Sequence, residues 1–166
     1  MRININMAGK YYSGKFKPTN IGKYQGAYDC ITYRSLWERQ VFRWCDMNTN
    51  VIKWSSEEII VPYLCKSDGK YHRYYVDLLI TFSNGKTYLI EIKPKSQTIP
   101  PKKPARQSKK FLTEVMTYVK NQSKWHAAEI FANQRGWEFQ VWTEDNLTNF
   151  GIKLILERAP KPKKKI

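Results

Sequence analysis

Two β-strand candidates joined by a short loop constrain the fold of this chain more than any other segment. Residues 71–82 and 86–93 are rich in β-branched and aromatic side chains, and the loop between them, Ser83-Asn84-Gly85, is typical of a β-hairpin. We therefore predict an antiparallel hairpin over residues 71–93.

Charged side chains interrupt both strands of this predicted hairpin. Asp77 lies in the first strand, and Glu91 and Lys93 lie near the end of the second. Residues two apart in a strand project from the same face, so Glu91 and Lys93 share one face. Ile90 and Ile92 then point to the opposite face, towards the core. Charges placed in an otherwise apolar strand are costly for structure alone, which suggests that they serve a chemical purpose.

Phosphodiester hydrolysis uses this combination of groups. Carboxylates hold one or two magnesium ions, and a lysine can orient the attacking water or stabilise the charged transition state. The pattern therefore predicts that Asp77, Glu91 and Lys93 form a metal-dependent nuclease site. The alternative is a solvated salt bridge on a surface hairpin.

The length of the hairpin loop tests this hypothesis. A two-residue turn at positions 84–85 would place Glu91 opposite Leu78 and would turn Asp77 to the other face of the sheet. A three-residue loop at positions 83–85, with its glycine in the left-handed region, places Asp77 directly opposite Glu91. The metal-site hypothesis requires the second arrangement or an equivalent bulge.

A helix is predicted from Ser35 to about Met47. Its apolar side chains recur at helical spacing on one face: Trp37, Val41, Trp44 and Cys45. Glu38 lies one turn into this helix, where it could reach a metal held by the sheet. Ser35 and Glu38 also form a capping-box sequence, in which the glutamate bonds back to the start of the helix. The residues leave both roles open.

The remaining segments predict a mixed sheet with helices on its faces, an α/β fold. Strands are expected at 51–54, 58–64, 137–143 and 153–156, a turn at 66–70, a short helix at 144–149, and a long helix from Phe111 to Gly136 with a break near Gln122. We expect three regions: an extended N-terminal arm over residues 1–30, a nuclease domain over 31–157, and a basic, disordered tail over 158–166.

The formal net charge of +15 favours a polyanionic partner, above all nucleic acid. A proline-rich basic segment, residues 94–110, directly follows Lys93 and lacks the pattern of a helix or strand. It is either a solvated loop or a DNA-contacting segment. The residues expected to hold the DNA backbone are Arg34, Lys95, Lys102, Lys103, Arg106, Lys109, Lys110 and Lys124.

Several other functions are disfavoured. No apolar run is long enough to span a membrane and the N-terminus lacks a signal-peptide centre, so we expect a soluble, intracellular protein without a membrane partner. The three cysteines contain no Cys-x-x-Cys pair suggesting zinc and are expected to be buried thiols. His72 and His126 are isolated and are interpreted as surface or structural residues, and Glu57-Glu58 as a solvated strand start. A glycine-rich phosphate loop is absent from the sequence.

Three motifs carry a resemblance to a known family. Residues 33–38 (YRSLWE), 74–77 (YYVD) and 90–94 (IEIKP) resemble the PD-(D/E)xK nucleases. They are most similar to the branch shared by TnsA-type transposition endonucleases and the head-completion nucleases of T-even-like tailed phages. Further matches lie at residues 11–16, 121–125 and 135–139, and the resemblance extends from Met7 to about Leu147.

The resemblance implies a central mixed sheet flanked by helices and DNA cleavage that depends on Mg²⁺, for which Mn²⁺ can substitute. The acid that the family carries on its first helix maps onto Glu38, which favours the functional role for that residue. The family's strand aspartate and Glu-x-Lys map onto Asp77, Glu91 and Lys93. Val76 stands where the family commonly has proline, a difference that removes no ligand.

The first hypothesis is therefore a Mg²⁺-dependent endonuclease that acts on double-stranded DNA during phage head completion, after packaging and before tail joining. It would work in the host cytoplasm or the virion, beside portal or neck proteins. A non-catalytic DNA-gripping head or neck protein is one alternative and would show salt-sensitive binding without cleavage. The cutting subunit of a transposon or restriction system is another and would need a partner protein for activity.

Overall fold

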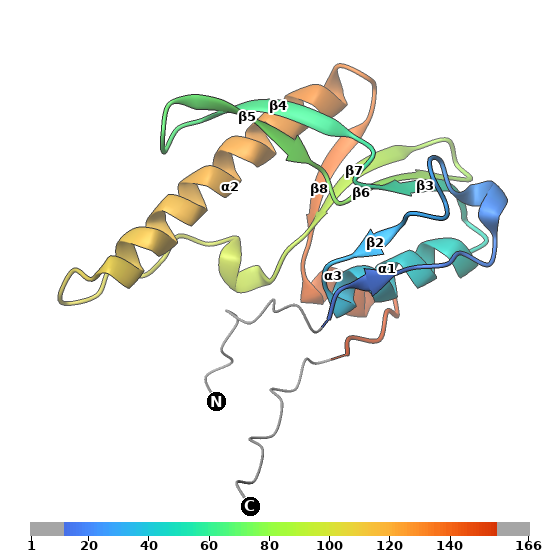
Figure 1. Ribbon diagram of the computed structural model, residues 1–166, viewed down its shortest axis with the longest axis horizontal. Helices are drawn as coiled ribbons and strands as arrows, with labels where there is room; N and C mark the ends of the chain where they lie inside the picture. Colours follow the sequence, from blue (N-terminus) through green and yellow to red (C-terminus); the bar gives the residue numbers. More distant parts are fainter. Residues whose placement is uncertain (1–11, 156–166) are drawn as a thin grey trace, which may run out of the picture.

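The computed structural model describes residues 12–155 and contains a four-stranded sheet with helices on both faces (Figure 1). The strand order is β3-β6-β7-β8, in which β6 pairs antiparallel with both β3 and β7, and β8 runs parallel to β7. These strands are Val51–Ser56 (β3), Leu78–Phe82 (β6), Thr87–Ile92 (β7) and Glu138–Trp142 (β8). The expected mixed sheet is confirmed.

A separate two-stranded ribbon and three α-helices complete the main framework. The ribbon pairs Ile60–Cys65 (β4) with Lys70–Tyr75 (β5), and the helices are Leu36–Met47 (α1), Lys109–Asn133 (α2) and Glu144–Asn149 (α3). Figure 1 shows α2 lying along this ribbon, on the opposite side of the sheet from α1. Within residues 12–155, no helix combines the length and the apolarity needed to cross a membrane.

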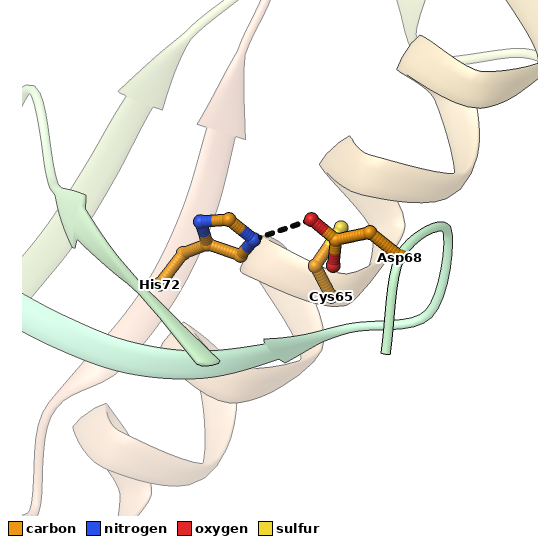
Figure 2. Close-up of side chains that lie close together, drawn as sticks. All are labelled: Cys65, Asp68 and His72. Carbon is orange, nitrogen blue, oxygen red and sulfur yellow. Dashed lines mark hydrogen bonds and ion pairs between the residues drawn. The ribbon is translucent and has the colours of Figure 1, made fainter. Parts of the chain in front are cut away.

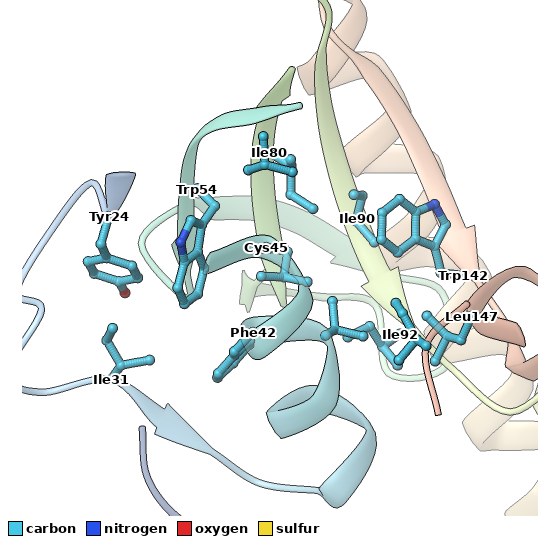
Figure 3. Close-up of a cluster of buried hydrophobic side chains, with 14 residues drawn as sticks. Tyr24, Ile31, Phe42, Cys45, Trp54, Ile80, Ile90, Ile92, Trp142 and Leu147 are labelled. Atoms are coloured by element: carbon cyan, nitrogen blue, oxygen red, sulfur yellow. The ribbon is translucent and has the colours of Figure 1, made fainter. Parts of the chain in front are cut away.

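The side-chain alternation of the strands creates two cores. Leu78, Ile80, Ile90 and Ile92 project towards α1 and pack with Trp54 and Phe42 (Figure 3). Leu89 projects from the other face, into a second core formed with α2 and the β4–β5 ribbon. Glu91 and Lys93 follow Leu89 at intervals of two, so the strand period brings them to this second face.

The described part of the N-terminal arm, residues 12–30, contains a short strand, Gly14–Lys15 (β1), a 3₁₀ turn, Ile21–Lys23 (η1), and an isolated parallel bridge from Tyr24 to Trp54. The strand β1 pairs with Thr32–Tyr33 (β2). Phe16 and Tyr24 contact the Trp54 ring at centroid distances of 5.9 and 4.8 Å, so aromatic packing fixes the arm to the α1 side. The predictions for residues 1–11 and for the basic tail lie outside the described residues.

The prediction of one strand over residues 71–82 is wrong. The chain leaves the ribbon after Tyr75 and enters the central sheet at Leu78, so β5 and β6 belong to different sheets. The two residues between them have other partners: Val76 N donates to Ile59 O at 3.0 Å, and the Asp77 carboxylate accepts from Ile92 N at 2.7 Å. An apolar pattern of period two continues through this junction, which hid the change of sheet from the sequence.

The predicted break near Gln122 is also wrong, because α2 runs without interruption from Lys109 to Asn133. Asn121 and Ser123 are buried, and the Ser123 hydroxyl donates to the Val119 carbonyl within the helix at 2.9 Å. Burial against the ribbon thus overrides the weak helix propensity of this polar stretch. The cap at Gly136 is confirmed, since its φ is +70° and Trp137 N donates back to Ala132 O.

Three smaller differences remain. Residues 153–155 form no strand, and Leu156 lies outside the described range. The basic segment begins with a 3₁₀ turn, Lys95–Gln97 (η2), and its last two residues open α2. Of the cysteines, Cys45 and Cys65 are buried as expected, whereas Cys30 is exposed.

Candidate active site

The hairpin loop sets the register that brings the two acidic side chains together. Phe82 N donates to Lys86 O at 2.9 Å, which closes a three-residue loop whose Gly85 has a φ of +82°. Leu78 pairs with Ile90, so the next positions along the two strands, Asp77 and Glu91, fall opposite each other. The second of the two registers considered from the sequence is confirmed.

Asp77 is held at the junction where the chain enters the central sheet. One of its carboxylate oxygens accepts from Ile92 N at 2.7 Å, and its own carbonyl accepts from Glu57 N at 3.3 Å. Burial, the Glu91 carboxylate and the Glu38 carboxylate all raise the pKa of Asp77 well above its ordinary value. Crowded carboxylates with this electrostatic conflict are typical of a site that a cation completes.

Glu91 is 4% exposed, and each of its oxygens has a partner. Oε2 accepts from the Tyr74 hydroxyl at 2.5 Å, and Oε1 lies 3.1 Å from Lys93 Nζ. Burial is the main cause that raises the pKa of Tyr74, so this phenol stays protonated and donates to Glu91. Tyr74 therefore orients the Glu91 carboxylate, a contact that was not identified from the sequence.

Glu38 has the capping contacts that its sequence suggested. Glu38 N donates to Ser35 Oγ at 3.2 Å, and its carboxylate accepts from Arg34 N at 2.7 Å and from the Ser35 hydroxyl at 3.1 Å. The same carboxylate contributes to the raised pKa of Asp77, so it is near enough to act on the acidic pair electrostatically. The Glu38 carboxylate therefore caps α1 and also acts on Asp77.

The donor set at the acidic pair fits a hard divalent cation. Asp77 and Glu91 offer carboxylate oxygens, which suit Mg²⁺, and their hydrogen-bond and ion-pair partners within residues 12–155 include no thiolate or imidazole. Among residues 12–155, three ligand side chains come within 4.8 Å of one another only in a different cluster, Cys65, Asp68 and His72. The carboxylate oxygens of Glu38, Asp77 and Glu91 therefore do not all lie within 4.8 Å of one another.

Arg34 and Glu57 form the rim of the site on the α1 side. Arg34 Nε and one terminal nitrogen lie 2.9 and 3.2 Å from the two Glu57 oxygens. Glu57 has a φ of +55°, uncommon for a residue with a side chain. Arg34 was predicted to bind DNA, and here it is paired with Glu57, which was interpreted from the sequence only as a solvated residue.

Lys124 reaches the acidic pair from α2. Its ammonium lies 5.2 Å from the centre of the Tyr74 ring. Burial lowers the pKa of Lys124, the nearby Lys93 charge lowers it further, and the Glu91 carboxylate opposes this effect. Because α2 is continuous through Gln122, Lys124 faces the site while Gln122 is exposed.

The other predicted DNA-binding residues lie in the basic segment and at the start of α2. Lys95 is tied to α3, since its backbone N donates to Glu144 at 2.8 Å and its ammonium lies 2.7 Å from Asp145. The rest are exposed side chains: Lys102, Lys103, Arg106, Lys109 and Lys110.

The mixed sheet, its flanking helices and the opposed carboxylates beside a lysine define a nuclease of the TnsA-like class. The profile described as "TnsA-like endonuclease N terminal" matches residues 48–144, more than half of the chain, and the chain therefore belongs to this endonuclease family. The match includes Asp77, Glu91 and Lys93, whereas Glu38 precedes it.

Among individual proteins, the chain is similar to the head completion nuclease of Enterobacteria phage T4. The two are 45% identical over 146 residues, which cover 86% of this chain and 97% of that protein. The predicted family and enzyme class are confirmed.

Proposed function

We propose that this endonuclease hydrolyses phosphodiester bonds of double-stranded DNA with Mg²⁺ held by Asp77 and Glu91. The observation that carries the proposal is the register of the β6–β7 hairpin, which sets the two carboxylates opposite each other next to Lys93. Nucleases of this family generally depend on a divalent metal, and Mn²⁺ offers similar oxygen-directed coordination. When bound, the ion supplies an acidified water and polarises the phosphate.

The protein's own groups have separate roles in this proposal. Lys93 orients the attacking water or stabilises charge on the phosphate, since its ammonium is tethered to Glu91 at 3.1 Å. Glu38 acts on Asp77 electrostatically from the α1 side, where it completes the site by aiding a second ion or a water. Tyr74 positions Glu91 and is not itself a reacting group.

DNA would be held by the basic rim around this site. Lys124 lies beside the acidic pair, and the exposed cations of residues 102–110 extend from it along the chain. Arg34 contributes once a phosphate replaces Glu57 as its partner. The net charge of +15 supports a polyanionic substrate.

The biological role that we infer is phage head completion, after DNA packaging and before tail joining. It rests on the similarity to the head completion nuclease of phage T4, 97% of which is covered. Such a role places the protein in the host cytoplasm during assembly or in the virion, in contact with DNA at a filled head and with portal or neck proteins.

The catalytic proposal is tested with supercoiled plasmid. The parent protein should nick or linearise the plasmid with Mg²⁺ and not with EDTA. Asp77→Asn and Lys93→Ala should each reduce the rate by about 100-fold or more, as loss of a metal ligand or of transition-state stabilisation does. Glu129→Gln, which neutralises an exposed acid on α2, should cut like the parent. Full activity in both site variants would show that the site is misassigned.

A further inference from the structure

A second cluster of metal-ligand side chains lies at the turn of the β4–β5 ribbon, on a different part of the chain from the acidic pair. It comprises Cys65 at the end of β4, Asp68 in the turn and His72 in β5 (Figure 2). Their sulfur, oxygen and nitrogen atoms all lie within 4.8 Å of one another. We propose that these three side chains bind a zinc ion, with water as the fourth ligand.

The backbone of the ribbon places the three side chains on one face. Cys65 pairs with Lys70 and Tyr63 pairs with His72, so Cys65, Tyr63 and His72 share the face that packs towards α2. Gly69, with a φ of +68°, allows the turn, and Asp68 is fixed there because its Oδ1 accepts from Lys70 N at 2.9 Å. The ligands are thus held by the fold before any ion binds.

The contacts within the cluster are consistent with a shared ion. His72 Nε2 lies 2.7 Å from an Asp68 oxygen, and Cys65 Sγ lies 2.9 Å from the Ser67 hydroxyl. The histidine–aspartate pair is partly exposed, and the buried Cys65 thiol adds a third, softer donor beside it. Ligand atoms around tetrahedral zinc are about 3.3–3.8 Å apart. A bound ion would therefore separate the His72–Asp68 contact of 2.7 Å and bring the other ligand atoms, which lie within 4.8 Å, to this spacing.

The donor chemistry selects zinc over the ion expected at the acidic pair. A thiolate and an imidazole suit Zn²⁺, whereas Mg²⁺ requires oxygen ligands. The spacing, Cys-x₂-Asp-x₃-His, contains one cysteine only, which is why a search for paired cysteines did not find it. The isolated, structural interpretation of His72 is replaced in this proposal by a ligand role.

The zinc site would clamp a strand that serves the active site. His72 and Tyr74 lie two residues apart on the same face of β5, and Tyr74 donates to Glu91 at 2.5 Å. On the other side of the cluster, Lys66 N donates to Ser123 Oγ on α2 at 3.2 Å. A bound ion would therefore stiffen the ribbon between α2 and the Glu91 contact without touching the substrate.

The test uses the full chain, stripped of metal, and Co²⁺ as a spectroscopic substitute for Zn²⁺. One equivalent of Co²⁺ should produce tetrahedral d–d bands and a thiolate-to-cobalt charge-transfer band, and Zn²⁺ should displace both. Cys65→Ser should abolish the charge-transfer band. Cys30→Ser, which changes an exposed cysteine outside the cluster, should retain it.

Two further variants keep the proposal open to refutation. His72→Gln alters a partly exposed side chain and should weaken Zn²⁺ binding by at least about 10-fold. Losing a group that only orients a metal ligand already costs about that much, and losing the ligand itself should cost no less. Its result is decisive if Cys65→Ser fails to fold. The double change Asp77→Asn and Glu91→Gln should leave the cobalt–thiolate band intact, which separates this site from the active site. Absence of the band in the parent, or unchanged affinity in His72→Gln, would overturn the proposal.

Discussion

At the scale of single residues, the acidic pair places function in conflict with stability. Asp77 and Glu91 face each other beside a buried strand, and Glu91 is compensated by Tyr74 and Lys93. Within residues 12–155 the Asp77 carboxylate accepts a hydrogen bond from the Ile92 amide alone, and the pKa of Asp77 is raised by burial and by two neighbouring acids. The ionised form of Asp77 therefore costs folding free energy until a cation binds.

This conflict predicts a stabilising but inactive variant. The folded-state pKa of Asp77 is raised. Its favourable contribution to the free energy of unfolding is therefore complete below the ordinary aspartate pKa of about 3.9 and is lost as pH rises through the raised pKa. Asp77→Asn keeps an oxygen for the Ile92 amide and removes the charge. In EDTA at pH 7 the variant should unfold at a higher urea concentration than the parent, and its free energy of unfolding should be larger by about 1 kcal/mol or more. This difference in stability should shrink towards pH 4. Glu129→Gln is the control, and equal stability of Asp77→Asn and parent at pH 7 would contradict this account.

A second prediction concerns Tyr74 as a positioning residue. Tyr74→Phe removes the hydroxyl that holds Glu91 and leaves a ring of the same shape. We expect plasmid cleavage to slow by about 10- to 100-fold, the usual cost of losing a residue that orients a ligand, with a higher Mg²⁺ concentration needed for half-maximal rate. A Mg²⁺ titration of the cleavage rate measures both effects. Tyr75→Phe alters the neighbouring exposed tyrosine and serves as the matched control; a rate loss without a change in Mg²⁺ dependence would argue against positioning.

At the scale of elements, the segments that the sequence predicted well have strong local signals. The helix α1 begins at a capping serine, and the β6–β7 loop has a glycine where a positive φ is needed. The errors arose where distant contacts decide the structure. The change of sheet at Asp77 depends on pairing with Ile59 and Ile92, and the continuity of α2 depends on the burial of Asn121 and Ser123. For the same reason Tyr74 and Lys124 could be found beside Glu91 only in three dimensions.

The hairpin loop gives a prediction at this scale. An added Cβ at Gly85 would meet no atom within 4 Å, so substitution there costs only the strain of its φ of +82°. Gly85→Ala should lower the free energy of unfolding by about 1 kcal/mol. Gly85→Asn should cost less, since asparagine tolerates this region. Urea unfolding of the two variants compares these costs, and equal losses for both would mean that the backbone conformation does not set the effect.

At the scale of the whole molecule, the positive charge is much larger than the active site requires. The acidic pair needs only nearby cations such as Lys93 and Lys124, yet the chain has a net charge of +15. The basic segment contributes exposed cations between residues 102 and 110, of which Lys110 has an acidic neighbour, Glu114, at 3.9 Å. Such charges act mainly on DNA affinity through counterion release, so their effect should be separable from that of the catalytic groups.

The salt dependence of DNA binding tests this separation. The double change Lys102→Gln and Lys103→Gln should weaken binding to a DNA duplex in EDTA and should reduce the slope of log K against log salt by up to about 2, because each phosphate contact contributes about 0.9. A matched control changes Lys53 and Lys86 to Gln, two exposed lysines towards the loop end of the central hairpin, away from Asp77. That control should lose less affinity and less slope, since its lysines are distant from the site where DNA must lie for cleavage. At saturating DNA the Lys102 and Lys103 variant should cut at the parental rate, because neither side chain reaches the reacting phosphate. A slope that falls equally in both double variants would show that the charge acts uniformly and that the basic segment is no dedicated DNA contact.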